Sequence, residues 1–218
     1  MNLSSRVLLG MWCLAGLGAC GRGGDVPAAR AEVPISAARA EPLLPKVSAP
    51  PTHVDSAVPR DVALRRFQQE SQRATTLGGG AASREELVER FVRAVEANDT
   101  AALGRLVLSR GEFAYLYYPS SAQGRPPYDL SPDLMWFMMV ERSNRGVTAL
   151  VAERAGRPLG FVGYHCVGDS TVEGRNRLWG PCLIRRAQAP GDTVEERLFG
   201  PIMARDGRFK FVSYSNKL

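Results

Sequence analysis

The sequence has 218 residues, which is enough for one folded domain with an additional segment. Its hydrophobic fraction of 44% and aromatic fraction of 8% are typical of a chain that packs a globular core. The formal net charge is +6, yet no long run of like charges occurs. This argues against a general nucleic-acid-binding protein, because such proteins concentrate their positive charge in one footprint.

The first residues have the pattern of an export signal. Arg6 precedes an apolar run over residues 7–17, and this run is shorter than the roughly 20 residues needed to span a bilayer. It ends in Leu17-Gly18-Ala19-Cys20, which resembles the bacterial lipobox, whose cysteine is lipidated and becomes the new N-terminus. We therefore expect residues 1–19 to be a lipoprotein signal peptide and Cys20 to carry the lipid. The alternative is an ordinary cleaved signal peptide with an incidental cysteine.

A lipid anchor predicts a location in the bacterial cell envelope, facing the periplasm. The first expected partner is then the membrane itself. Gly21 follows the cysteine where an aspartate would resemble an inner-membrane retention signal. We therefore expect the outer membrane rather than the inner one.

Residues 20–58 are rich in Ala, Pro, Gly and Ser and have no hydrophobic period, which predicts a disordered tether. Residues 59–82 are expected to hold a short amphipathic helix with few apolar positions, followed by Gly78-Gly79-Gly80 as a joint. No strand precedes these glycines and no Gly-Lys-Ser or Gly-Lys-Thr follows them. The segment therefore lacks the pattern of a phosphate-binding loop.

The folded domain is expected over residues 83–218. Ser83-Arg84-Glu85-Glu86 predicts a capping box, and apolar residues between Leu87 and Val95 then recur at helical spacing. Asp99 is expected to cap a second, short helix. After an aromatic segment over residues 112–119, Ser131-Pro132-Asp133 predicts the start of a third helix, which we expect to end at Gly146.

After Gly146 the hydrophobic period changes and predicts strands separated by turns. The Asp206-Gly207 pair predicts a tight hairpin near the C-terminus. Helices followed by an antiparallel meander are typical of an α+β domain. The predicted strands are Val147–Arg154, Pro158–Val167, Arg175–Ala187, Val194–Arg205 and Arg208–Ser213.

The body of the chain has two cysteines, Cys166 and Cys182. Two cysteines in an exported domain most simply form one disulfide, and these lie in sequential predicted strands. The alternative is two buried free thiols. We expect no metal and no cofactor, because only His165 lies near the cysteines and a structural zinc site normally takes four nitrogen or sulfur ligands.

The order of elements resembles the superfamily of nuclear transport factor two, ketosteroid isomerase and the polyketide cyclases. Most of the likeness lies in residues 85–107, where a helix ends in Asn98-Asp99 and a short helix of Ala and Leu follows. Residues 206–212 also look like that superfamily's last hairpin. The resemblance covers about residues 83–216. It implies N-terminal helices packed on a curved antiparallel sheet that leaves a cone-shaped pocket.

No position matches the isomerase branch well enough to carry a catalytic role across. From residue type alone, Glu141 and His165 are candidate bases and Tyr115 is a candidate hydrogen-bond donor. The alternatives are that Glu141 lies at a solvated helix end, that His165 is a structural histidine and that Tyr115 belongs to the core. Four other residues are candidates for lining an apolar ligand-binding cavity. The alternative for each is ordinary core packing. These residues are Tyr117, Trp136, Met139 and Trp179.

Three functions follow from these features. The first is a non-enzymatic lipoprotein whose cone-like domain binds a hydrophobic small molecule or an envelope protein, with no nucleic acid among its partners. The second is a small isomerase, dehydratase or cyclase that uses Glu141 or His165 as its base. The third is an assembly factor that forms a homodimer through the open face of its sheet, and it requires an exposed apolar surface there.

Overall fold

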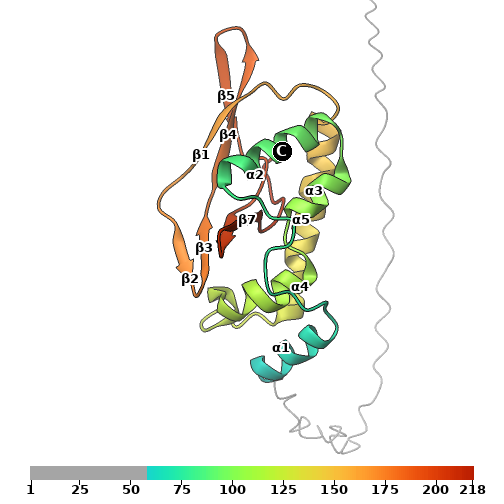
Figure 1. Cartoon of the computed structure of the whole chain (residues 1–218), viewed down its shortest axis with the longest axis vertical. Helices are drawn as coiled ribbons and strands as arrows, with labels where there is room; N and C mark the ends of the chain where they lie inside the picture. Colours follow the sequence, from blue (N-terminus) through green and yellow to red (C-terminus); the bar gives the residue numbers. More distant parts are fainter. Residues whose placement is uncertain (1–57) are drawn as a thin grey trace, which may run out of the picture. The chain divides into compact units, whose positions relative to one another are not determined.

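The computed structural model describes residues 58–218, so the predicted signal peptide, Cys20 and nearly all of the predicted tether lie outside the described residues. Figure 1 shows the strands on one side of the described unit and helices α2, α3 and α5 on the other. The α-helices are α1 (Arg60–Gln69), α2 (Arg84–Glu96), α3 (Thr100–Leu106), α4 (Arg110–Glu112) and α5 (Pro132–Arg154). A π-helix, η1 (Phe113–Tyr117), and two 3₁₀-helices, η2 (Tyr118–Ser120) and η3 (Ala122–Gly124), follow α4. Within residues 58–218, no helix combines the length and the apolar character needed to cross a membrane.

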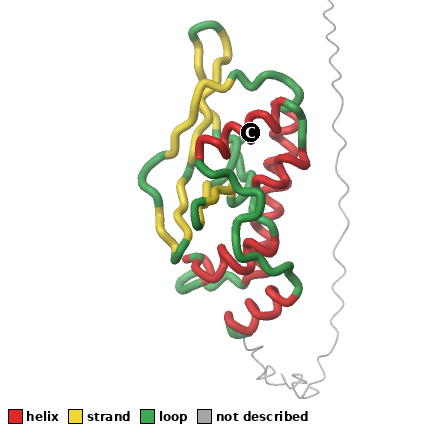
Figure 2. The backbone as a smooth tube through the Cα atoms, viewed as in Figure 1, coloured by secondary structure: helices red, strands yellow, loops and turns green. Residues whose placement is uncertain are grey.

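The described strands form two antiparallel sheets (Figure 2). One sheet has the order β1-β4-β5 and the other has the order β2-β3-β6-β7. The prediction of an α+β architecture with antiparallel strands after the helices is therefore confirmed. The strands are β1 (Phe161–Cys166), β2 (Thr171–Glu173), β3 (Asn176–Trp179), β4 (Cys182–Ala189), β5 (Asp192–Glu196), β6 (Ile202–Arg205) and β7 (Arg208–Phe211).

Helices α2 and α3 form where the local pattern predicts them. The Ser83 hydroxyl accepts the amide of Glu86 at 3.0 Å, whereas the Glu86 carboxylate accepts the amide of Ala82 at 2.6 Å rather than that of Ser83. The expected reciprocal capping is thus present with a shift of one residue. Asp99 caps α3 by accepting the amide of Ala102 at 2.8 Å.

Helix α5 continues through Gly146 to Arg154, so the predicted helix end at Gly146 and the predicted strand Val147–Arg154 are wrong. Gly146 is a point of close packing, because a Cβ there would overlap with the carbonyl oxygen of Tyr214. The apolar residues that follow recur at helical spacing and pack into the core, and this pattern outweighs their β propensity. These residues are Val147, Leu150 and Val151.

Two of the predicted strands are each divided in the structure. The stretch Arg175–Ala187 forms β3 and β4, which separate at Gly180-Pro181 because proline has no amide hydrogen for the ladder. The stretch Val194–Arg205 likewise forms parts of β5 and β6. In both cases the chain passes from one sheet to the other at the break.

Two clusters of buried side chains stabilise the described unit. The first joins α2 and α5 to the strands, and in it the Phe91 ring lies 5.2 Å from the Phe199 ring, centroid to centroid. The second contains Phe67 of α1, Leu77 and Phe113, with the two phenylalanine rings edge to face at 5.6 Å. Helix α1 and the segment before the glycines are therefore packed parts of the folded unit rather than a joint outside it.

Candidate functional site

One pocket brings together two of the predicted ligand-binding residues, Tyr117 and Met139. Its volume is about 210 Å³, and we call it the methionine pocket. Its apolar lining consists of Leu130, Met135, Met138, Met139, Pro201 and Val212. Its polar lining consists of Tyr117, Gln123, Arg142, Ser213 and Ser215.

Helix α5 forms one wall of the methionine pocket. Its first turn is fixed by Ser131, whose hydroxyl accepts the amide of Leu134 at 3.3 Å. Met135, Met138 and Met139 then fall at i, i+3 and i+4 and share one face of the helix. Because methionine is unbranched and polarisable, this wall can adjust to ligands of different shapes.

The C-terminal segment, residues 212–216, contributes another part of the lining. The amide of Val212 donates to the carbonyl oxygen of Pro201 at 2.8 Å, and the amide of Tyr214 donates to the Ser143 hydroxyl of α5 at 3.0 Å. The close approach at Gly146 lets the segment lie directly on the helix. The pocket thus depends on contacts between parts of the chain that are distant in sequence.

Tyr117 comes from the π-helix η1, a helix type that often marks functional sites. The preceding carbonyl group, that of Leu116, accepts hydrogen bonds from Asn176 Nδ2 at 2.8 Å and from Arg205 Nη1 at 3.1 Å. Burial, followed by the negative charge of Glu173, raises the pKa of Tyr117 to about 12. At neutral pH Tyr117 is therefore a neutral phenol that can donate or accept a hydrogen bond.

The other two predicted ligand-binding residues lie outside the methionine pocket. Trp136 packs against Phe113, with 5.2 Å between the ring centroids. Trp179 lies beneath the Arg84 guanidinium at 4.8 Å from the ring centroid, a cation–π arrangement. Trp136 therefore packs beside the pocket in the second core cluster, and Trp179 belongs to another part of the surface.

The three candidate catalytic residues lie on three different elements. Glu141 is exposed on α5, and the Tyr115 hydroxyl donates to the carbonyl oxygen of Gln68 at 3.1 Å. His165 is about half exposed on β1, with Nδ1 3.5 Å from the Glu195 carboxylate. None of the three lines the methionine pocket. The structure therefore does not assemble them into one site.

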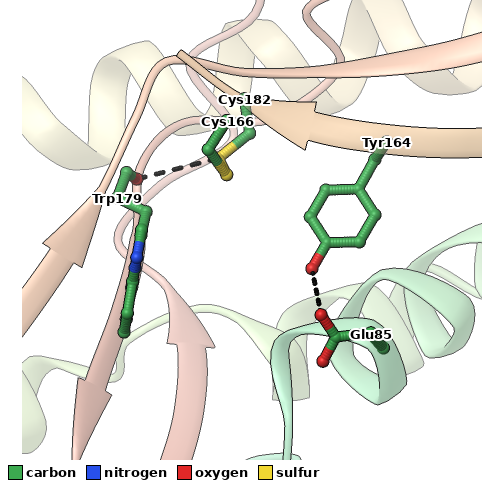
Figure 3. Close-up of a disulfide and its surroundings, with 5 residues drawn as sticks. All are labelled: Glu85, Tyr164, Cys166, Trp179 and Cys182. Atoms are coloured by element: carbon green, nitrogen blue, oxygen red, sulfur yellow. Dashed lines mark hydrogen bonds between the residues drawn. A yellow bond between two sulfur atoms is a disulfide. The ribbon is translucent and has the colours of Figure 1, made fainter. Parts of the chain in front are cut away.

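His165 and Trp179 instead border an open hollow at the end of β1, close to the disulfide. Figure 3 shows the Tyr164 hydroxyl directed at the Glu85 carboxylate, to which it donates at 3.0 Å. Burial and this hydrogen bond raise the pKa of Tyr164 to about 12, whereas backbone hydrogen bonding lowers the pKa of Glu85. The pair links β1 to the start of α2, and the hollow also contains the side chains of His165 and Asp169.

The predicted disulfide between Cys166 and Cys182 is confirmed. The two residues are directly opposed in the β1–β4 ladder (Figure 3). The closed loop contains β2 and β3, including the buried Asn176 that binds the Leu116 carbonyl. The disulfide therefore fixes the hairpin that supports the residue before Tyr117.

A charged cluster links α5 to the first sheet. The Glu196 carboxylate of β5 binds Arg186 of β4 at 2.7 Å and Arg154 of α5 at 2.9 Å. The hydrogen bonds from Arg186, followed by those from Arg154, hold the pKa of Glu196 at about 2. Glu196 is therefore ionised at neutral pH and has a structural role.

Sequence reasoning did not identify the buried ion pair between Glu112 and Lys210. The Lys210 ammonium lies 2.9 Å from the Glu112 carboxylate, and both side chains are less than 5% exposed. The same carboxylate accepts the amides of Gly78 at 2.6 Å and Ser109 at 2.7 Å. The Ser109-x-x-Glu112 spacing is a capping box and could have indicated this structural role.

Sequence reasoning also missed Arg142 and the C-terminal wall of the methionine pocket. Arg142 follows Met138 by four residues, so helical spacing could have placed it beside the methionine face. No local signal identifies residues 212–216 as a pocket wall, because their position is set by contacts with α5.

Within residues 58–218, no group of three or more His, Cys, Asp or Glu side chains is arranged to hold a metal ion. Comparison of the chain with protein-family models, with curated proteins and with solved structures found no match. The function is therefore argued from the geometry and chemistry of the sites described above.

Proposed function

We propose that the folded unit binds an apolar small molecule in the methionine pocket and acts without catalysis. The observation that carries this proposal is the composition of the pocket, in which six apolar residues are combined with a few polar groups. Such a lining is typical of small-molecule sites, where apolar walls supply affinity and a few polar groups fix the orientation. The residues lining the pocket include no carboxylate, imidazole or thiol.

The two ionisable residues of the pocket are poor general bases. The raised pKa keeps the Tyr117 phenol protonated at neutral pH, and a guanidinium such as that of Arg142 offers only hydrogen-bond donors. General acid–base catalysis is most efficient when the pKa of the catalytic group lies near the working pH. This argument favours binding over the isomerase, dehydratase or cyclase alternative.

We further propose that Cys20 is lipidated and that the chain is held in the bacterial cell envelope, at the outer membrane. The apolar run, the lipobox-like residues 17–20 and Gly21 support this location. The resemblance to the cone-shaped superfamily also remains a proposal. The antiparallel strands and the position of a pocket beside the long helix α5 are compatible with it.

The binding proposal can be tested with the methionine methyl groups as reporters. The protein is labelled with ¹³C at these methyl groups and titrated with 1-octanol, a neutral apolar probe, while NMR spectra are recorded. Binding in the pocket should shift the signals of Met135, Met138 and Met139. The signal of Met203, which is fully buried in the core and does not line the pocket, should stay in place.

Two variants give this experiment its controls. Val212→Phe places a larger side chain in the pocket lining and should weaken octanol binding, with the Met203 signal reporting whether the core is intact. Phe137→Ala changes an exposed residue of α5 outside the lining and should leave binding unchanged. If octanol moves no methionine signal of the pocket, the proposal is wrong.

A second candidate function, homodimerisation through a sheet surface, is favoured by three exposed valines. Val162 and Val172 are 50% and 60% exposed on β1 and β2, and Val167 between these strands is 51% exposed. Because β1 and β2 belong to different sheets, a contact surface that includes these valines would extend over both. Sedimentation velocity over a range of concentrations tests this candidate. A dimer that dissociates in the Val162→Ser/Val172→Ser variant would support it, and a monomer at every concentration would contradict it.

A further inference from the structure

A second hollow, of about 350 Å³, adjoins the methionine pocket. The two share Arg142 and Ser215, so they lie side by side along α5 and the C-terminal segment, and we call them together the depression. The second hollow adds Arg145, Asn216 and Leu218 to its lining. The depression is therefore apolar at one end and rich in arginine at the other.

The two arginines of this depression are available to a ligand. Within residues 58–218, neither Arg142 nor Arg145 forms an ion pair or a side-chain hydrogen bond. By contrast, Arg90 and Arg105, which line the hollow beside α2 and α3, are already paired with Glu86 and Asp99. A guanidinium without a partner next to an apolar cavity is suited to a carboxylate or phosphate group, which it can bind through two parallel hydrogen bonds.

The size of the methionine pocket limits the apolar part of the ligand. Its volume of about 210 Å³ lies below the roughly 300–1,000 Å³ of pockets that enclose drug-sized ligands, so the apolar part of the ligand is short. A short apolar chain in the pocket can place its head group beside Arg142, which lines both hollows.

We propose that the ligand is an amphiphile with an acidic head group and a short apolar tail. Arg142 and Arg145 bind the head group, and the methionines enclose the tail. This inference rests on the proposed function, because it names the ligand class of the same pocket. A free medium-chain fatty acid has this chemistry. An anionic membrane lipid shares it through its acidic head group and the adjoining part of its acyl chain.

The test compares octanoate with 1-octanol, which have the same tail and differ in charge. Both are titrated into the methyl-labelled protein in its wild-type form and as Arg142→Gln/Arg145→Gln. Wild type should bind octanoate more tightly than octanol. The double variant should lose roughly tenfold in octanoate affinity, as expected for lost charge-assisted hydrogen bonds, and should lose much less of its octanol affinity, because octanol carries no charge.

A matched control removes the same charge elsewhere. Arg73 and Arg157 are exposed and line neither hollow, so Arg73→Gln/Arg157→Gln should leave both affinities unchanged. If wild type binds octanoate and octanol equally tightly, the inference of an acidic head group is wrong. The proposed binding function is then still supported. If neither octanoate nor octanol binds, both proposals are wrong.

Two further probes distinguish the sources of the head group and the part played by the tail. If inorganic phosphate binds as tightly as octanoate, the ligand is not an amphiphile, because the tail then contributes nothing to the affinity. Vesicles of anionic phospholipid that compete with octanoate in wild type, and not in the arginine double variant, would identify a membrane lipid as the source. If such vesicles do not compete and octanoate binds, the ligand is a free amphiphile.

Discussion

Removal of the disulfide should lower the free energy of unfolding by about 3 kcal/mol. Cys166 and Cys182 are 16 residues apart, and the loss of chain entropy on closing a loop of about this length corresponds to about 3 kcal/mol at 25 °C. The double variant Cys166→Ala/Cys182→Ala leaves no free thiol from the pair. Urea unfolding followed by far-UV circular dichroism measures the change, with the slope against urea checked for two-state behaviour.

The wild-type protein in the presence of a thiol reductant is the control for this measurement. Cys182 is fully buried, so the double variant also loses packing contacts that the reduced wild type keeps. Similar losses in both samples would assign the effect to the cross-link. A loss below about 1 kcal/mol in both would refute the reasoning, because the loop of β2 and β3 would then be held by its other contacts alone.

Three further changes test other parts of the structure by the same unfolding measurement. The depressed pKa of Glu196 means that its ionised form stabilises the fold, fully above about pH 4.5 and progressively less as pH falls towards 2. Wild type should therefore lose about 2 kcal/mol more than Glu196→Gln over this range, after allowance for partial exposure. Gly146→Ala should destabilise by about 1–3 kcal/mol through overlap with the C-terminal segment, whereas Gly104→Ala, with open space around it in α3, should stabilise by about 0.5–1 kcal/mol. Glu112→Gln should destabilise by about 3–5 kcal/mol, because the buried Lys210 side chain then lacks its carboxylate partner. A loss no larger than about 0.5 kcal/mol, usual for a surface change, would contradict this assignment.

The parts of the fold that sequence predicts well are those fixed by neighbours in the chain. The caps of α2 and α3 depend on side chains within three or four residues, and the Asp206-Gly207 turn depends on two residues that tolerate positive φ. The disulfide followed from the number of cysteines in a chain with a predicted export signal. The caps and the turn can be predicted because residues close together in the sequence determine them.

The errors lie where distant segments decide the outcome. Glycine often ends a helix, and this suggested a stop at Gly146. Here the missing side chain serves the contact with Tyr214, and the helix continues because the next apolar residues keep their helical spacing. A hydrophobic pattern is therefore better evidence for helix continuation than one glycine is for its end.

The candidate site also could be predicted only in part from the sequence. Methionines at 135, 138 and 139, followed by Arg142, form an apolar stripe on α5 that ends in a charge. The spacing of these residues predicts that they share a face, but it does not say whether that face meets the core or a cavity. The C-terminal segment decides this, because it covers part of the stripe and leaves the remainder open beside Arg142 and Ser215. Displacing that segment, as in Gly146→Ala, should therefore weaken octanol binding as well as stability, which a pocket built by α5 alone would not do.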